Sequence, residues 1–156
     1  MTATRSLRPE NAAVRTARAF CTAQLRAELT GGLSPYAMED LAGDAAMVVS
    51  ELVTNAIRAG ASTIRLDVGR VGGLFRITVI DDADGMPNLS EPDPNAVAGR
   101  GLRIVDALSA RWGVEPSNGR KRVWADLDLT NPSTDGLRGG VVGRSVRRID
   151  DRMAAG

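Results

Sequence analysis

The sequence predicts a two-layer α/β (α+β) sandwich, in which helices cover one face of a mixed, mainly antiparallel sheet. Two segments with helical spacing come first, and two pairs of short apolar segments follow, each pair joined by a glycine-containing turn. The 156 residues suffice for one domain and are too few for two ordinary ones. We expect a domain over residues 1–129 and a disordered tail over residues 130–156, which are rich in Gly, Arg and Asp.

The two helical segments lie in the first part of the chain. Apolar residues recur at roughly helical spacing over Pro9–Leu29. Ser34 then has the character of a helix N-cap, because proline follows it at the first helical position. The second helical pattern continues to about Ala59, is weakened at Gly43 and stops at Gly60.

The second part of the chain predicts two hairpins with a loop and a third helix between them. The four strands are expected at Ser62–Val68, Leu74–Ile80, Trp112–Glu115 and Arg122–Leu129. Residues 81–98 are acidic and proline-rich with little periodicity, which is typical of a loop. A helix with an apolar side is expected to begin near Gly101.

The composition excludes several classes of site. Cys21 is the only cysteine and there is no histidine, so a disulfide framework, a zinc cluster and Ser-His or Cys-His catalytic pairs are excluded within one chain. The net charge of +1 gives no electrostatic reason to expect nucleic acid or an acidic membrane as a partner. The N-terminus lacks the apolar core of a signal peptide, and no apolar run approaches the ~20 residues that span a bilayer. We therefore expect a cytoplasmic protein.

Glu51 and Asn55 interrupt an otherwise apolar stretch of the second helix. They are four residues apart and therefore share one face of the helix. An isolated pair of this kind usually belongs to a solvated stripe, here together with Arg58. The alternative is a carboxylate and an amide that face a cleft, where they would hold a metal–phosphate group and orient a nucleophile.

An acidic cluster follows the second predicted strand, with the sequence Asp81-Asp82-Ala83-Asp84-Gly85-Met86-Pro87. Such a cluster is usually a turn, because Gly and Pro are ordinary turn formers. A carboxylate at the end of a strand can also accept a hydrogen bond from an exocyclic amine, which would select adenine over guanine. A glycine nearby would let a purine lie against the backbone.

The third motif is Gly99-Arg100-Gly101-Leu102 at the start of the third predicted helix. Glycines leave backbone N–H groups uncovered there and the helix dipole adds positive potential, so the position suits phosphate. Two glycines before a helix also occur in ordinary loops. The motif is not the dinucleotide fingerprint, because Ile104 stands at its third glycine position, and the chain has no Gly-Lys pair of a P-loop.

Together the three motifs resemble the nucleotide-binding boxes of the GHKL (Bergerat-fold) ATPase superfamily. Glu51–Ala56 is similar to the N box, Asp81–Met86 to the first glycine box and Gly99–Leu102 to the second. The resemblance covers roughly Leu7 to Leu129 and extends to the anti-sigma-factor serine kinases, a group of short regulators common in actinomycetes. The ending Lys121-Arg122-Val123-Trp124 is also similar to theirs.

The resemblance implies a role for each motif residue. Glu51 would be the general base, Asn55 would coordinate Mg²⁺, and Asp81 would bind the adenine amino group. The remaining contacts to the base and the phosphates would come from Gly85, Met86, Gly99, Arg100, Gly101 and Leu102. The segment Asn88–Ala98 would correspond to the ATP lid.

Three features depart from the pattern of the superfamily. Ala83 replaces the usual first glycine of its box, Ala59 stands where related sequences often carry histidine, and the lid segment is short. These departures leave adenine recognition intact and bear on catalytic turnover.

The resemblance implies ATP or ADP and Mg²⁺ as cofactors. It favours a serine/threonine-protein kinase that phosphorylates an anti-sigma-factor antagonist and sequesters a sigma factor. One alternative is a non-catalytic nucleotide-binding module that regulates transcription by docking to a partner. Another is a remnant of a histidine-kinase catalytic domain. The expected partners are proteins rather than nucleic acid or membrane, and a homodimer is consistent with relatives that commonly dimerise.

Overall fold

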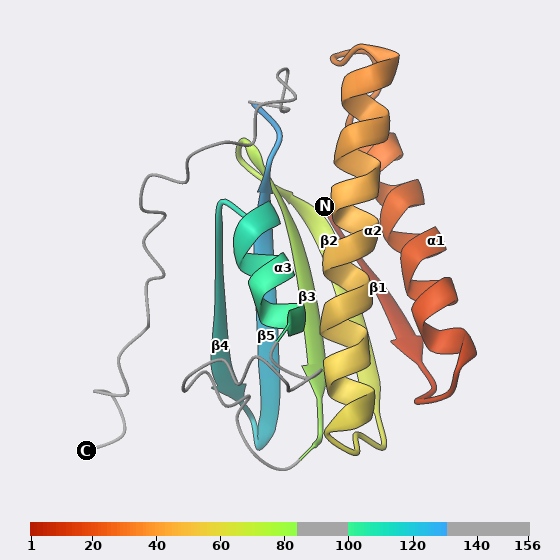
Figure 1. The fold of residues 1–156 in the computed structure, drawn as a ribbon, viewed down its shortest axis with the longest axis vertical. Coiled ribbons are helices and arrows are strands. Elements are labelled where there is room, and N and C mark those ends of the chain that lie inside the picture. Colours follow the sequence, from red (N-terminus) through yellow and green to blue (C-terminus); the bar gives the residue numbers. More distant parts are fainter. Residues whose placement is uncertain (84–99, 131–156) are drawn as a thin grey trace, which may run out of the picture.

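The computed structural model of the chain describes residues 1–83 and 100–130 (Figure 1). Its elements are β1 (Thr2–Leu7), α1 (Ala12–Glu28), α2 (Pro35–Arg58), β2 (Ile64–Val71), β3 (Leu74–Asp81), α3 (Arg100–Leu108), β4 (Arg111–Ser117) and β5 (Arg120–Asp128). The predicted tail beyond Thr130 and most of the predicted 81–98 loop lie outside the described residues.

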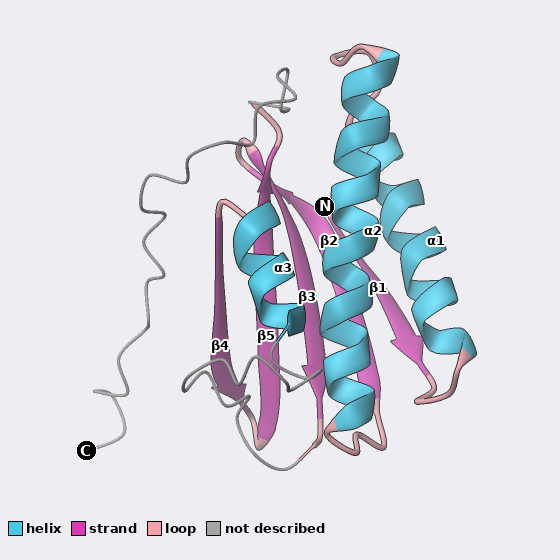
Figure 2. Cartoon of the chain, viewed as in Figure 1, coloured by secondary structure: helices cyan, strands magenta, loops and turns pink. Residues whose placement is uncertain are grey.

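The strands form one sheet in the order β1-β2-β3-β5-β4, and every neighbouring pair is antiparallel. The three helices lie together on one face of this sheet (Figure 2). The predicted fold class, a two-layer sandwich with a mainly antiparallel sheet, is therefore confirmed. None of the helices in the described part of the chain is long and apolar enough to cross a membrane.

Strand β1 has no counterpart among the predicted elements. It forms an edge of the sheet, and only Leu7 of its side chains is fully buried, so the strand lacks the apolar alternation of its neighbours. Gly69 lies opposite Thr2, and a Cβ atom there would come within 2.7 Å of the Met1 carbonyl oxygen. The close approach of the chain end is thus possible because residue 69 is glycine.

Helix α1 packs through mostly small side chains that recur every fourth residue. The buried positions are Ala13, Ala17, Cys21 and Leu25. This row lies against α2 and the sheet, as expected for an amphipathic helix. Arg18 also donates a hydrogen bond to Ser50 Oγ, which in turn donates to the Ala46 carbonyl of α2.

Helix α2 begins and ends where the sequence predicts. The Ser34 side chain accepts a hydrogen bond from the Ala37 N–H, so it is the predicted N-cap. The helix runs unbroken through Gly43, and a Cβ atom there would meet open space. It ends at Arg58, and Gly60 adopts a positive φ of 84° just beyond.

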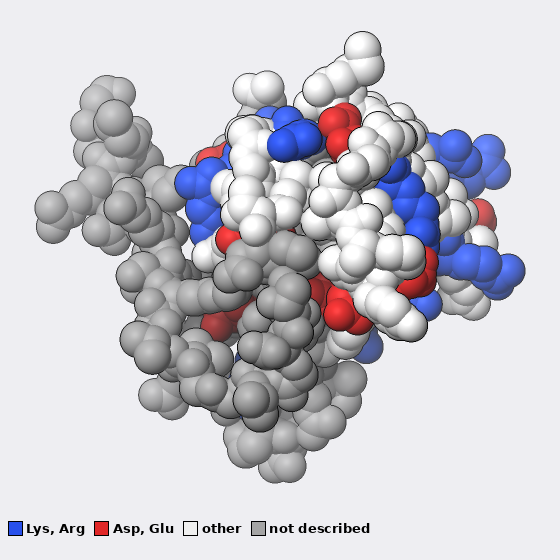
Figure 3. Space-filling view, turned by 90° about the horizontal axis from the view of Figure 1, so that it is seen from above, with Lys and Arg blue, Asp and Glu red and all other residues white. Residues whose placement is uncertain are grey.

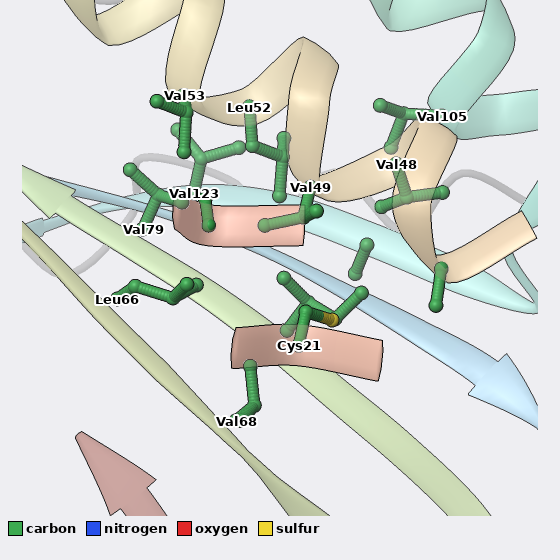
Figure 4. Close-up of a cluster of buried hydrophobic side chains, with 14 of the residues drawn as sticks. Cys21, Val48, Val49, Leu52, Val53, Leu66, Val68, Val79, Val105 and Val123 are labelled. Atoms are coloured by element: carbon green, nitrogen blue, oxygen red, sulfur yellow. The ribbon is translucent and has the colours of Figure 1, made fainter. Parts of the chain in front are cut away.

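The core lies between α2 and the middle of the sheet and is built almost entirely from aliphatic side chains (Figure 4). Val49 and Val53 of α2 pack over Leu66, Val79 and Val123 of the sheet. These branched side chains are buried together and fill the space between helix and sheet. The position of α2 along the sheet is consequently fixed.

The second predicted hairpin closes through a tight turn. Asn118 and Gly119 both have positive φ, 51° and 72°, which is the geometry of a type I′ turn. Asn-Gly is the pair that this turn prefers, because both central residues must adopt left-handed conformations. The turn fixes the register in which Lys121 at the start of β5 lies opposite Pro116 of β4.

The face of the sheet opposite the helices, which none of the described helices covers and which we call the uncovered face, carries a buried carboxylate between two arginines. Asp126 is fully buried and accepts hydrogen bonds from Arg76 at 2.7 and 2.8 Å and from Arg111 at 2.6 Å. The Arg76 guanidinium also lies 4.5 Å from the centre of the Trp124 ring. Burial by itself would raise the pKa of Asp126, but the hydrogen bonds and charges of the two arginines outweigh burial and lower it.

Asp126→Asn should lower the free energy of unfolding at pH 7 by about 1–3 kcal/mol, a range that allows for the partial exposure of both arginines. A carboxylate whose pKa is lowered by folding stabilises the protein above the ordinary aspartate pKa of about 3.9. That stabilisation is lost as the pH falls through the folded-state pKa. Urea denaturation between pH 7 and pH 3 should therefore show a flatter pH dependence for Asp126→Asn than for the wild type.

The matched control is Asp40→Asn, because Asp40 is an exposed aspartate on α2. Its free energy of unfolding at pH 7 should stay within about 0.5 kcal/mol of the wild-type value. Equal stability and equal pH dependence of the wild type and Asp126→Asn would show that the two arginines do not stabilise the fold through this carboxylate.

Candidate functional site

The structure brings the described parts of the three sequence motifs to one end of the molecule. The C-terminal half of α2, the end of β3 and the beginning of α3 all lie toward the lower end of Figure 1. The start of β5 joins them, because Asp81 at the end of β3 lies opposite Lys121 in the sheet. The core packing of α2 and the register of the sheet together set this arrangement.

Glu51 and Asn55 lie on one flank of α2. Leu52 points into the core, and Ser50 points toward α1 through its hydrogen bond with Arg18. Since successive helical residues are about 100° apart, Glu51 and Asn55 occupy the opposite flank, toward α3. α2 and α3 pack against each other.

The burial of this pair differs from that of a solvated stripe. Glu51 and Asn55 are both half-buried, whereas Arg58 on the same side of the helix is exposed. Within the described residues, neither side chain of the pair takes part in a hydrogen bond or an ion pair. A carboxylate and an amide are thus held one turn apart with free hydrogen-bonding capacity.

Asp81 is the most deeply buried acidic side chain at this end of the molecule, with 1% of its surface exposed. Its Oδ1 accepts a hydrogen bond of 2.9 Å from the Ala83 N–H, which turns the chain as it leaves the strand. Its Oδ2 is buried and has no hydrogen-bond partner in the described structure. The ammonium group of Lys121 lies 3.5 Å from Oδ2 and balances the charge.

Asp82 has a different role from that of its neighbour. It is exposed, and its Oδ1 accepts hydrogen bonds from the backbone N–H groups of Ser62 and Thr63 at 2.8 and 2.9 Å. The hydrogen bond from Thr63, with that from Ser62, lowers the pKa of Asp82 below its ordinary value. Asp82 thereby ties the α2–β2 connection to the end of β3, while Asp81 retains an unused oxygen.

Helix α3 is anchored on both sides. Val105 is fully buried in the core and Leu102 packs against it. The Trp112 indole N–H donates a 3.0 Å hydrogen bond to Asp106, which fastens the helix to β4. The first backbone N–H groups of the helix, which the helix itself does not use, are therefore held at the same end as Asp81.

Several predicted site residues cannot be placed. Gly85, Met86 and Gly99 lie outside the described residues, as does the segment Asn88–Ala98 that was expected to be the lid. Arg100 and Gly101 form the first turn of α3, but only their place in the helix is described.

Lys121 is the site residue to which the sequence analysis assigned no role. Lys121 was named there only as the first residue of the segment Lys121-Arg122-Val123-Trp124, which is similar to the anti-sigma-factor kinases. The signal that could have singled it out is composition, since Lys121 is the single lysine among 20 basic residues. In the structure the Lys121 side chain lies beside Asp81, and only 8% of its surface is exposed.

The described residues fit a nucleotide better than a metal ion alone. They contain no group of three His, Cys, Asp or Glu side chains that could hold a metal. Mg²⁺ often takes few protein ligands and completes its coordination shell with phosphate oxygens and water. The side-chain oxygen of Asn55 could therefore serve as a Mg²⁺ ligand when a nucleotide supplies the phosphates. The buried, unpartnered Asp81 Oδ2 requires a hydrogen-bond donor such as an exocyclic amine.

Residues 7–127 match the family of histidine kinase-like ATPase domains. This match covers most of the chain, and the chain belongs to that family, which lies within the GHKL superfamily. Membership implies that the domain binds ATP.

The chain is also similar to individual proteins of other bacteria. It is 56% identical over 41 residues to the DNA mismatch repair protein MutL of Desulforudis audaxviator, a match that covers 26% of the chain and 7% of MutL. The solved structure of the RsbU and RsbW domains of a Mycobacterium tuberculosis protein superposes with a TM-score of 0.56 at 23% identity, over 82% of this chain and 32% of that one. A histidine kinase domain of the Erythrobacter litoralis EL346 blue-light activated kinase has a TM-score of 0.48 at 27% identity, over 60% and 46%.

The family assignment rests on the match over residues 7–127, and the likeness to the Mycobacterium tuberculosis structure concerns the fold. The chain spans less than half of each of these relatives.

Proposed function

We propose that the chain is an ATP-binding regulator and a Mg-ATP-dependent protein serine kinase of the anti-sigma-factor type, which phosphorylates an antagonist protein and sequesters a sigma factor. One observation carries the proposal: Glu51 and Asn55 lie one turn apart on the α3 flank of α2, at the same end of the molecule as the buried Asp81. The resemblance of the motifs and flanking sequence to the anti-sigma-factor kinases supports the finer assignment.

Each described residue has a chemical role under this proposal. Asp81 accepts a hydrogen bond from the adenine amino group through Oδ2, which is buried and otherwise unpartnered. The N–H groups at the start of α3, including that of Leu102, bind phosphate oxygens with the help of the helix dipole. The resemblance assigns the remaining nucleotide contacts to Gly85, Met86, Gly99, Arg100 and Gly101.

The catalytic step falls to Glu51 in this proposal. Its half-exposed carboxylate can accept the proton of a partner's seryl hydroxyl as the phosphoryl group is transferred. Mg²⁺ held by Asn55 and the phosphates would neutralise the charge of the transferred group. Asn55 lies one helical turn from Glu51, so the residue proposed to hold Mg²⁺ and the proposed base share one flank of α2.

A nucleotide-binding module without catalysis is the second candidate function. Ala83, which replaces the usual first glycine of its box, is half-buried and packs against the core, so the turn after β3 is stiffer than glycine would make it. In this case ATP or ADP would act as a ligand that controls docking to a protein partner.

The first test concerns adenine recognition. Asp81→Asn should weaken ATP binding about 10- to 100-fold, because a charge-assisted hydrogen bond in a buried site is replaced by a weaker or mispaired one. Isothermal titration calorimetry gives the affinities. Asp82→Asn is the matched control, since the amide oxygen can still accept the Ser62 and Thr63 hydrogen bonds, and its ATP affinity should equal that of the wild type. Unchanged affinity of Asp81→Asn would remove the adenine assignment.

The second test separates the two candidate functions. Glu51→Gln should reduce phosphotransfer from labelled ATP to antagonist proteins of the native host by about 10²- to 10⁴-fold, the usual contribution of a general base. Its ATP affinity should stay close to the wild-type value. Glu39→Gln is the control, because Glu39 is an exposed carboxylate on the same helix that pairs with Arg26. A wild-type protein that binds ATP but phosphorylates none of these antagonists would leave the binding module as the function.

A further inference from the structure

Asp81 and Lys121 form a buried pair that a purely structural ion pair does not explain. They lie directly opposite each other on β3 and β5, and their side chains are 1% and 8% exposed. The distance from Nζ to Oδ2 is 3.5 Å, which is longer than the usual length of a charge-assisted hydrogen bond. Burying two charges without closing that bond is costly.

The pair therefore retains hydrogen-bonding capacity on both partners. Asp81 Oδ2 has no hydrogen-bond partner in the described structure. The ammonium group of Lys121 has three N–H donors. Among the described residues, its ion pair with Asp81 is its one charged contact. A buried acceptor without a hydrogen-bond partner thus lies beside an ammonium group at the end of the sheet.

By contrast, the other buried carboxylate of the sheet is saturated. Asp126 receives three hydrogen bonds from its two arginines, all shorter than 3.0 Å. The chain can therefore build a closed ion pair on this sheet. At Asp81 the ion pair is longer, at 3.5 Å, and Oδ2 has no hydrogen-bond partner in the described structure.

A purine edge would satisfy both groups at once. On its Watson–Crick edge, adenine presents a donor, the 6-amino group, next to an acceptor, the ring nitrogen N1. Guanine presents the opposite order, an acceptor O6 next to the N1–H donor. A carboxylate beside an ammonium group in fixed positions consequently complements the adenine edge in one orientation.

We propose that Lys121 is a second base-recognition residue, which donates a hydrogen bond to adenine N1 while Asp81 Oδ2 accepts one from the 6-amino group. This inference rests on the ATP binding proposed above and deepens it. Lys121 determines specificity in this site, and it reads a different atom of the base from the one that Asp81 reads.

The test compares ATP with 1-deaza-ATP, in which a C–H group replaces N1. Calorimetry on the full chain should show that the wild type binds 1-deaza-ATP about 10- to 100-fold more weakly than ATP, the loss expected for a charge-assisted hydrogen bond. Lys121→Met, which removes the donor and keeps the length of the side chain, should bind the two nucleotides equally. Arg120→Met is the control, because Arg120 is an exposed neighbour, and it should discriminate as the wild type does.

The outcomes are separable. A wild type that binds neither nucleotide removes the proposed ATP binding and this inference with it. A wild type that binds both equally, or a Lys121→Met variant that discriminates as strongly as the wild type, overturns the role of Lys121 and leaves ATP binding standing. The wild-type comparison needs no variant, so it decides the matter even where Lys121→Met, which leaves Asp81 as an unpaired buried charge, fails to fold.

Discussion

The close packing of α2 on the sheet is the constraint on which the rest of the molecule depends. Val49 and Val53 pack over Val79 and Val123 without large aromatic side chains between them. This contact sets where α2 lies along the strands, and hence where Glu51 on its flank stands relative to the end of β3. A loose core would leave a carboxylate and an amide on a helix with no fixed relation to the strand end.

A second constraint is that the site keeps buried polar groups with unused hydrogen-bonding capacity. Folding buries Asp81 at the end of β3 but provides a partner for only one of its oxygens. Lys121 balances its charge without closing the hydrogen bond. Stability is thus given up at this end of the sheet, whereas Asp126 on the uncovered face is fully paired. On the face of the molecule shown in Figure 3, positively and negatively charged side chains are interspersed.

The sequence predicts the elements whose signals are local. α2 shows periodicity, an N-cap at Ser34 and a glycine stop, and the second hairpin shows the Asn-Gly turn, so both are predicted closely. β1 was missed because an edge strand needs little apolar alternation, and its partner β2 is 57 to 67 residues away in the chain. Lys121 gained no role for a related reason: its pairing with Asp81 follows from sheet register, which is non-local. The assignment of Asp81 rather than Asp82 came from a resemblance, and burial distinguishes the two only once the chain is folded.

A backbone amide chemical-shift map on addition of Mg-ATP tests the location of the nucleotide site most directly. The largest changes should fall on the second half of α2, on Asp81 to Ala83, on the first turns of α3 and on Lys121. The uncovered face of the sheet around Trp124 and Asp126 should change little. Changes concentrated on that uncovered face, or the absence of any change at saturating Mg-ATP, would contradict the site at the end of β3.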